Sequence, residues 1–172
     1  MATVAKIEAA SRQLDTAIHL FFSGGDSISI RTLAAGAENI FADISDHTLG
    51  HSWRSWLGDE HELSEKQLRA IFRQEWNFFK HTDKDPEGTL EFDDSITDHM
   101  LFLASLECAT VQNKISLITQ VYQIWYVAAH PDKFPKTDSL FTTAQQALPF
   151  LPHLERSEQI LVGAEFLAEK LR

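Results

Sequence analysis

The sequence has few residues that break helices or form covalent cross-links. Of its 172 residues, five are proline, seven are glycine and one is cysteine. The composition is neither that of a disordered chain nor that of a collagen-like chain. The single cysteine, Cys108, has no partner for an intramolecular disulfide and falls in an apolar stretch. We therefore expect it to be a small buried side chain in a protein of the reducing cytoplasm.

The sequence has no long apolar run. Residues 1–13 lack the apolar core of roughly 7–15 residues that a secretory signal needs. The most apolar region, residues 115–129, is interrupted by Thr119, Gln120 and Gln123 and is shorter than the roughly 20 residues that span a bilayer. We expect a soluble cytoplasmic protein that makes no membrane contact.

Positive charge is also scarce, since 15 lysines and arginines stand against 25 acidic residues, a formal net charge of −10. This balance argues against a broadly basic nucleic-acid surface or a polybasic membrane contact, and it leaves a local basic patch open. The content of 44% hydrophobic and 23% charged residues suits one compact domain with a sizeable core.

Apolar residues recur at helical spacing along most of the chain, and no segment shows the alternation of a strand. The pattern predicts helices over residues 4–22, 26–44, 64–81 and 111–129, with further helices starting at Asp93 or Asp94, at Asp138 and at Ser157. Residues 111–129 form either a separate helix or a kinked extension of the preceding one. In residues 45–63 the apolar residues do not recur at a regular spacing. This pattern predicts a structured connection that can contain a helical turn.

The predicted fold is all-α, an up-and-down helical bundle of six or seven helices in a single domain, residues 1–172. Residues 1–129 form its main bundle, residues 130–137 a connector, and residues 138–172 the C-terminal helices that pack on it. The segment 111–129 is apolar on several sides, which is typical of a helix in the middle of a bundle. The predicted central core consists of Ile115, Ile118, Val121, Tyr122 and Trp125.

Residues 83–94 approximate an EF-hand calcium loop between two predicted helices. The oxygen-bearing residues at loop positions 1, 3, 5, 7, 9 and 12 are Asp83, Asp85, Glu87, Thr89, Glu91 and Asp94. Gly88 stands where the loop needs a sharp turn, whereas Pro86 and the short Asp94 side chain weaken the expected calcium affinity. The alternative is an acidic, solvated turn between two helices.

A second candidate site lies at the end of the helix predicted over residues 64–81. Asn77 and His81 are four residues apart and share one helical face, and Arg73 lies one turn earlier. An all-helical bundle with this polar residue and histidine near a helix C-terminus resembles the HEPN domain family. In that family an Arg-x4-6-His motif carries metal-independent RNA cleavage in dimers, while many members lack activity and serve as interaction modules. Here Trp76 precedes Asn77, so the motif is not intact.

The resemblance implies two functions. The first is a non-enzymatic interaction module like a degenerate HEPN domain, a homodimer that also has room for another protein partner. More apolar stripes than a four-helix core requires favour such self-association. The second is an RNase in which His81 moves the 2′-hydroxyl proton while Asn77 and Arg73 orient the substrate or stabilise phosphate charge. Alternatively, His81 only caps its helix and Asn77 faces solvent.

A transition-metal site is the third candidate. Asp43, His47 and His51 follow one another at a spacing of four residues, and Asp15 and His19 have the same spacing. Such carboxylate and imidazole pairs on neighbouring helices bind zinc or iron in bundle cores. Gly50 argues against a helix that extends to His51, and chance pairs are the alternative explanation.

The remaining chemistry is sparse, because the sequence has neither a nucleophile elbow nor a glycine-rich phosphate loop. Trp76 and Trp125 fall in core registers of predicted helices. Trp53 and Trp56, beside Arg54, are better placed for stacking on bases or sugars, with packing against the bundle as the alternative.

Overall fold

The computed structural model describes residues 3–81 and 86–172 of the chain. Within these ranges the chain forms helices and no strands, so the predicted all-α class is confirmed. The α-helices are α1 (Lys6–Phe22), α2 (Ser27–Leu49), α3 (Trp53–Glu60), α4 (Glu65–Lys80), α5 (Ser95–Val111), α6 (Leu117–Ala129), α7 (Ser139–Ala147) and α8 (Arg156–Lys170). Two 3₁₀ turns, η1 (Pro131–Lys133) and η2 (Leu151–His153), connect the last three.

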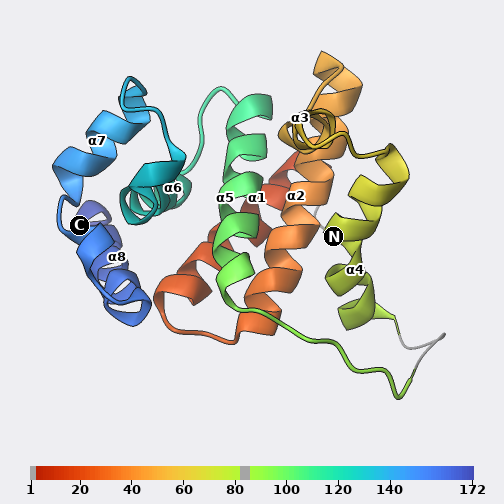
Figure 1. The fold of residues 1–172 in the computed structure, drawn as a ribbon, viewed down its shortest axis with the longest axis horizontal. Helices are drawn as coiled ribbons and strands as arrows, with labels where there is room; N and C mark the ends of the chain where they lie inside the picture. Colours follow the sequence, from red (N-terminus) through yellow and green to blue (C-terminus); the bar gives the residue numbers. More distant parts are fainter. Residues whose placement is uncertain (1–2, 82–85) are drawn as a thin grey trace.

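Three groups of helices make up the molecule (Figure 1). The central group contains α1, α2 and α5, and α2 packs along both of the others. Helices α3 and α4 lie on one side of this group, and α7 and α8 lie on the other. Helix α6 contacts α1 and α5 as well as α7 and α8, so it joins the C-terminal helices to the centre.

Side-chain caps fix where several helices begin. Ser64 and Gln67 form the predicted capping box at the start of α4, and Asp26 accepts a hydrogen bond from the Ser29 amide at 2.8 Å. The Ser116 hydroxyl caps α6 at the Thr119 amide, so residues 112–116 separate α5 from α6. The kinked-extension alternative for residues 111–129 is therefore wrong.

Among the described residues, α3 brings the number of α-helices to eight, against the six or seven predicted, and it lies where the sequence predicted a connection with a helical turn. It forms because Ser52 and Ser55 exchange the reciprocal hydrogen bonds of a capping box. Helix α2 is also longer than predicted and reaches Leu49, where Gly50 ends it with a left-handed φ of 78°.

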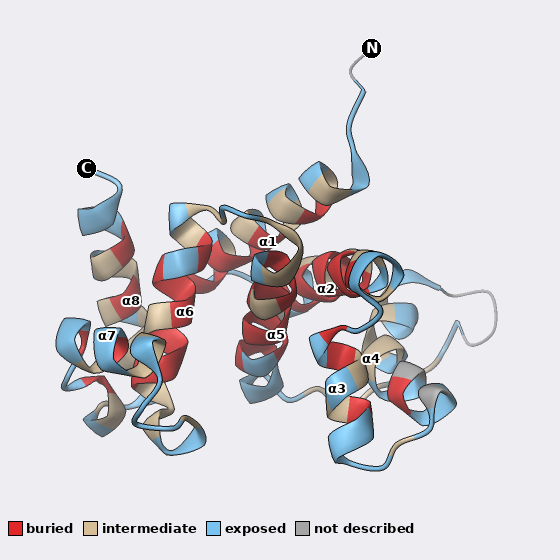
Figure 2. Cartoon of the chain, turned by 90° about the horizontal axis from the view of Figure 1, so that it is seen from above, coloured by how far each residue is buried: buried red, intermediate tan, exposed pale blue. Residues whose placement is uncertain are grey.

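The core lies where the central group meets α6 (Figure 2). Val121, Tyr122 and Trp125 are almost fully buried, as predicted, whereas Ile115 and Ile118 are half-buried because they lie before and in the first turn of α6. No helix in the described part of the chain combines the length and the apolarity needed to cross a membrane.

Candidate functional site

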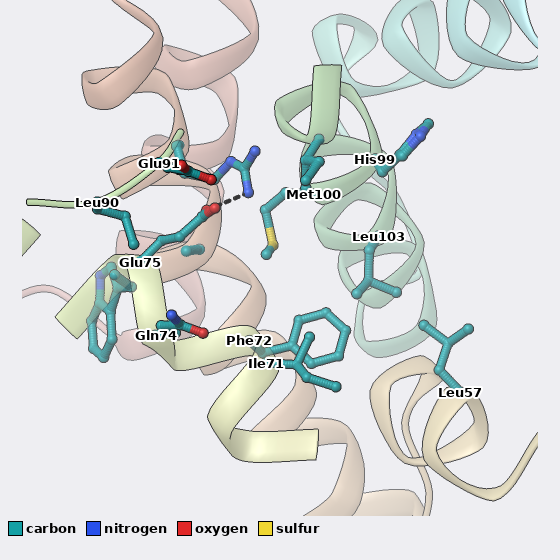
Figure 3. A pocket seen from close by; sticks show the side chains of 14 residues that line it. Leu57, Ile71, Phe72, Gln74, Glu75, Leu90, Glu91, His99, Met100 and Leu103 are labelled. Carbon is teal, nitrogen blue, oxygen red and sulfur yellow. Dashed lines mark hydrogen bonds and ion pairs between the residues drawn. The ribbon is translucent and has the colours of Figure 1, made fainter. Parts of the chain in front are cut away.

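A hollow of about 540 Å³ lies between α2, α4 and α5, and we call it the α4 pocket (Figure 3). Its volume falls in the range of sites that hold a small molecule or a few inserted side chains. Most of its wall is apolar, and the apolar residues that line it are Ala35, Leu57, Ile71, Phe72, Leu90, Ile96, Met100 and Leu103. Its polar lining residues are Arg31, Gln74, Glu75, Glu91 and His99, with Trp76 beside them.

The apolar wall follows from the periodicity of two helices. Ile71 and Phe72 belong to the apolar stripe of α4, and Ile96, Met100 and Leu103 follow one another at helical spacing on α5. Ile71 remains 58% exposed and Ile96 remains 43% exposed, although both line the pocket. The pocket therefore has apolar side chains at its mouth as well as in its interior.

Arg31 on α2 is the main charged group of the α4 pocket and is almost completely buried. Its guanidinium donates to Glu75 Oε2 on α4 at 2.6 Å, to Thr97 Oγ1 on α5 at 3.2 Å and to the Asp93 carbonyl at 3.2 Å. Burial lowers the Arg31 pKa, and the nearby Glu75 carboxylate opposes that effect. Arg31 thus joins three elements through bonds within the protein.

His99 belongs to a separate polar group behind the pocket. Figure 3 shows its ring directed away from the other lining side chains. Its Nδ1 lies 2.7 Å from the Tyr126 hydroxyl, and its Nε2 lies 3.3 Å from Lys133 Nζ. Burial and the Lys133 charge lower the His99 pKa, and the pKa of neighbouring His130 falls to about 4 for the same reasons. A pKa of about 4 keeps the His130 ring neutral at pH 7.

A second buried polar cluster lies beneath α3, and we call it the Glu38–Glu107 cluster. Glu38 on α2 and Glu107 on α5 are both fully buried. The Arg54 amide donates to Glu107 Oε1 at 2.9 Å, and the Arg54 guanidinium lies 3.7 Å from Glu38 Oε2 and donates to Asp43 at 2.6 Å. Burial raises the pKa of Glu38 to about 8 and that of Glu107 to about 7.

The sequence reasoning singled out neither Glu38 nor Glu107, although a signal was present. Glu38 occupies the apolar face of α2, four residues after Ala34, and Glu107 is flanked by Leu106 and Cys108. A carboxylate on the buried face of an amphipathic helix is uncommon, because burial without compensation disfavours its charged form.

The residues of the predicted RNase site lie along α4, which contains Arg73 and Asn77 and ends at His81. Arg73 Nε donates to Asn39 Oδ1 at 3.2 Å and lines a groove along α2. Asn77 and His81 are exposed at the end of α4, where the His81 amide donates to the Asn77 carbonyl at 3.0 Å. This bond is the last backbone hydrogen bond of α4 and does not involve the His81 side chain, so the capping alternative also stays a prediction. The RNase hypothesis stays a prediction.

The predicted calcium loop falls partly outside the described residues, because Asp83 and Asp85 lie between residues 81 and 86. Of its other members, Glu87, Thr89 and Asp94 are exposed, and Glu91 lines the α4 pocket. The calcium hypothesis stays a prediction.

The predicted transition-metal residues have other partners or face solvent. Asp43 pairs with Arg54, and Asp15 accepts hydrogen bonds from Ser116 and Thr119. His19, His47 and His51 are exposed, and His51 lies beyond the end of α2. Within residues 3–81 and 86–172, no three His, Cys, Asp or Glu side chains are grouped as a metal site requires.

No protein-family model, no curated protein and no solved structure matches this chain significantly. The fold and the site together define an all-α helical protein with a largely apolar pocket, one wall of which contains the buried Arg31. The likeness to HEPN domains stays a prediction.

Proposed function

We propose that this protein is a non-enzymatic interaction module that acts as a homodimer through α4. The observation that carries this proposal is an apolar pocket with exposed apolar residues at its mouth. The charged group of this pocket, Arg31, already forms hydrogen bonds to other residues of the protein. The surface involved, which we call the α4 patch, consists of Ile71, Phe78, Ile96 and the mouth of the α4 pocket.

The polar groups of the α4 pocket favour binding over catalysis. The guanidinium nitrogens of Arg31 donate to acceptors on α4 and α5 and at Asp93, and Glu75 accepts one of these bonds. Catalysis needs acid, base or charge-stabilising groups free to meet the reacting atoms. An incoming group at this pocket meets mainly apolar side chains, whose contribution comes from surface removed from water, with Gln74 and Glu91 as polar neighbours.

The arrangement of the exposed residues supports a second copy as the partner. Ile71 and Phe78 are seven residues apart on α4, so they lie on one stripe of the helix, and Phe78 remains 37% exposed. A two-fold axis through this stripe would bring the same apolar surface together from both copies. Full burial of an exposed isoleucine or phenylalanine contributes about 1.5–3 kcal/mol, and the residues of the α4 patch, which are already partly buried, would each contribute a fraction of that. Because a symmetric dimer buries Ile71, Phe78 and Ile96 from both copies, their contributions together would stabilise the interface.

The resemblance to HEPN domains supports the same reading, since members of that family form dimers and many lack activity. The single cysteine, buried and without a disulfide partner, supports action in the cytoplasm.

Sedimentation velocity of two matched variants tests the proposal. Ile71→Glu places a charge in the α4 patch, whereas Leu161→Glu places the same charge on α8, where Leu161 is 64% exposed. We expect the wild type and Leu161→Glu to sediment as dimers and Ile71→Glu to sediment as a monomer. A monomeric wild type, or three proteins that sediment alike, would contradict the proposal. Far-UV circular dichroism checks that each variant is folded.

A further inference from the structure

Two tryptophans on α3 form an exposed aromatic corner, which we call the Trp53–Trp56 corner. Their ring centroids lie 5.7 Å apart with an interplanar angle of 79°. Trp53 is 38% exposed and Trp56 is 50% exposed. The rings border a hollow of about 440 Å³ whose other lining residues are His51, Ser52 and Thr110. Two large rings that stay in water at right angles are an unusual feature of a protein surface.

Hydrogen bonds hold the Trp53–Trp56 corner in place. The Trp53 indole N–H donates to Thr110 Oγ1 on α5 at 3.1 Å, and the Thr110 hydroxyl lies 3.0 Å from the Leu106 carbonyl. The Ser52–Ser55 capping box fixes the first turn of α3, and the Arg54 amide, between the two tryptophans in sequence, is tied to Glu107. The corner is therefore organised before any ligand arrives, which reduces the entropy lost on binding.

The charges around the Trp53–Trp56 corner are mainly negative. Trp53, Trp56 and Glu60 follow at spacings of three and four residues, so they share one face of α3, and Asp59 is exposed beside them. Asp43 and Asp46 on α2 pair with the buried Arg54 guanidinium, so the acidic groups that Arg54 leaves uncompensated here are Asp59 and Glu60 on α3. The lining of the hollow itself contains no lysine, arginine, aspartate or glutamate, so the negative charge comes from Asp59 and Glu60 beside it on α3.

We propose that the Trp53–Trp56 corner binds the guanidinium group of an arginine in a basic segment of a partner protein. The face of an indole ring attracts a cation, and guanidinium groups stack on aromatic rings more often than ammonium groups do. The nearby carboxylates add long-range attraction for a basic segment. This site lies on α3, outside the α4 patch, and does not depend on the homodimer.

Nuclear magnetic resonance of the indole N–H groups tests this assignment directly. The four tryptophans give four indole signals, which single substitutions assign. The probe is the peptide acetyl-Gly-Arg-Gly-Arg-Gly-amide, and its control carries citrulline, which has nearly the same shape without the charge, in place of both arginines. We expect the arginine peptide to shift the Trp53 and Trp56 signals saturably and to leave Trp125 unchanged. We expect the citrulline peptide to shift neither signal.

Two substitutions of Trp56 separate ring stacking from a general effect of the acidic surface. Trp56→Leu should weaken binding of the arginine peptide about fivefold, the equivalent of about 1 kcal/mol for one cation–π contact, and Trp56→Phe should restore part of it. Since Trp56 is half exposed, both variants should stay folded. An unchanged signal from the buried Trp125 would show that the core of each variant is intact.

Three results would overturn the assignment. They are equal shifts with the citrulline peptide, undiminished affinity in Trp56→Leu, and no shift with either peptide. A titration with single-stranded oligouridylate covers the competing class of ligand. Shifts of Trp53 and Trp56 with this RNA but not with the arginine peptide would also contradict the proposal.

Discussion

Replacing Glu38 by glutamine should remove part of the pH dependence of stability. Glu38 is fully buried, and burial raises its pKa from 4.5 to about 8 against the weaker opposing effect of Arg54. Between these two pH values the folded protein keeps a proton that the unfolded chain releases. The stabilisation is therefore complete below pH 4.5 and is lost as the pH rises through 8.

The size of the effect follows from the shift. One pKa unit corresponds to about 1.4 kcal/mol, so Glu38 should lower the free energy of unfolding by about 3 kcal/mol between about pH 6 and about pH 9. Glutamine resembles the protonated carboxyl group in shape and carries no charge at any pH. We therefore expect Glu38→Gln to gain about 3 kcal/mol relative to the wild type over this interval.

Urea denaturation followed by circular dichroism measures this difference at each pH. The lowered pKa values of His99 and His130 affect stability in both proteins alike, so they cancel in the comparison. Glu60→Gln, on the exposed end of α3, is a matched control that should follow the wild type. Parallel curves for the wild type and Glu38→Gln would refute the reasoning that burial keeps this carboxyl group protonated.

Three further outcomes are expected. Gly163→Ala should destabilise the protein by at least about 2 kcal/mol in urea denaturation, because the new Cβ would lie 2.2 Å from Phe22 Cε1. Glu75→Ala should cost about 3 kcal/mol in the same assay, because it leaves the buried Arg31 without its carboxylate. The wild type and His81→Ala should leave a single-stranded RNA equally intact on denaturing gels, and cleavage by the wild type alone would favour the RNase hypothesis.

Local signals in the sequence were sufficient to predict most of the helices. Residues close together in the sequence define the apolar stripes between residues 4 and 44, and they also define the Ser64–Gln67 capping box. The structure contains both features. Helix α3 escaped prediction because its eight residues are too few to show a clear period. Its start depends on a serine pair instead of the Ser-x-x-Glu or Ser-x-x-Gln pattern of a usual capping box.

The α4 pocket was beyond prediction from local patterns, because its parts are distant in sequence. Arg31 and Glu75 are 44 residues apart and meet only when α4 packs beside α2. The spacing that suggested an RNase site placed Arg73 near His81 along one helix. It held no information on Asn39, which binds the Arg73 side chain from α2. Trp53 and Trp56, the two surface candidates among the tryptophans, are indeed exposed.

Native mass spectrometry of the wild type mixed with Ile71→Glu is the most direct test of the proposed homodimer. The wild type should give dimers at twice the chain mass, and the variant should remain monomeric and enter few mixed dimers. A wild type that is monomeric throughout, or mixed dimers in statistical proportion, would contradict an interface built on the α4 patch.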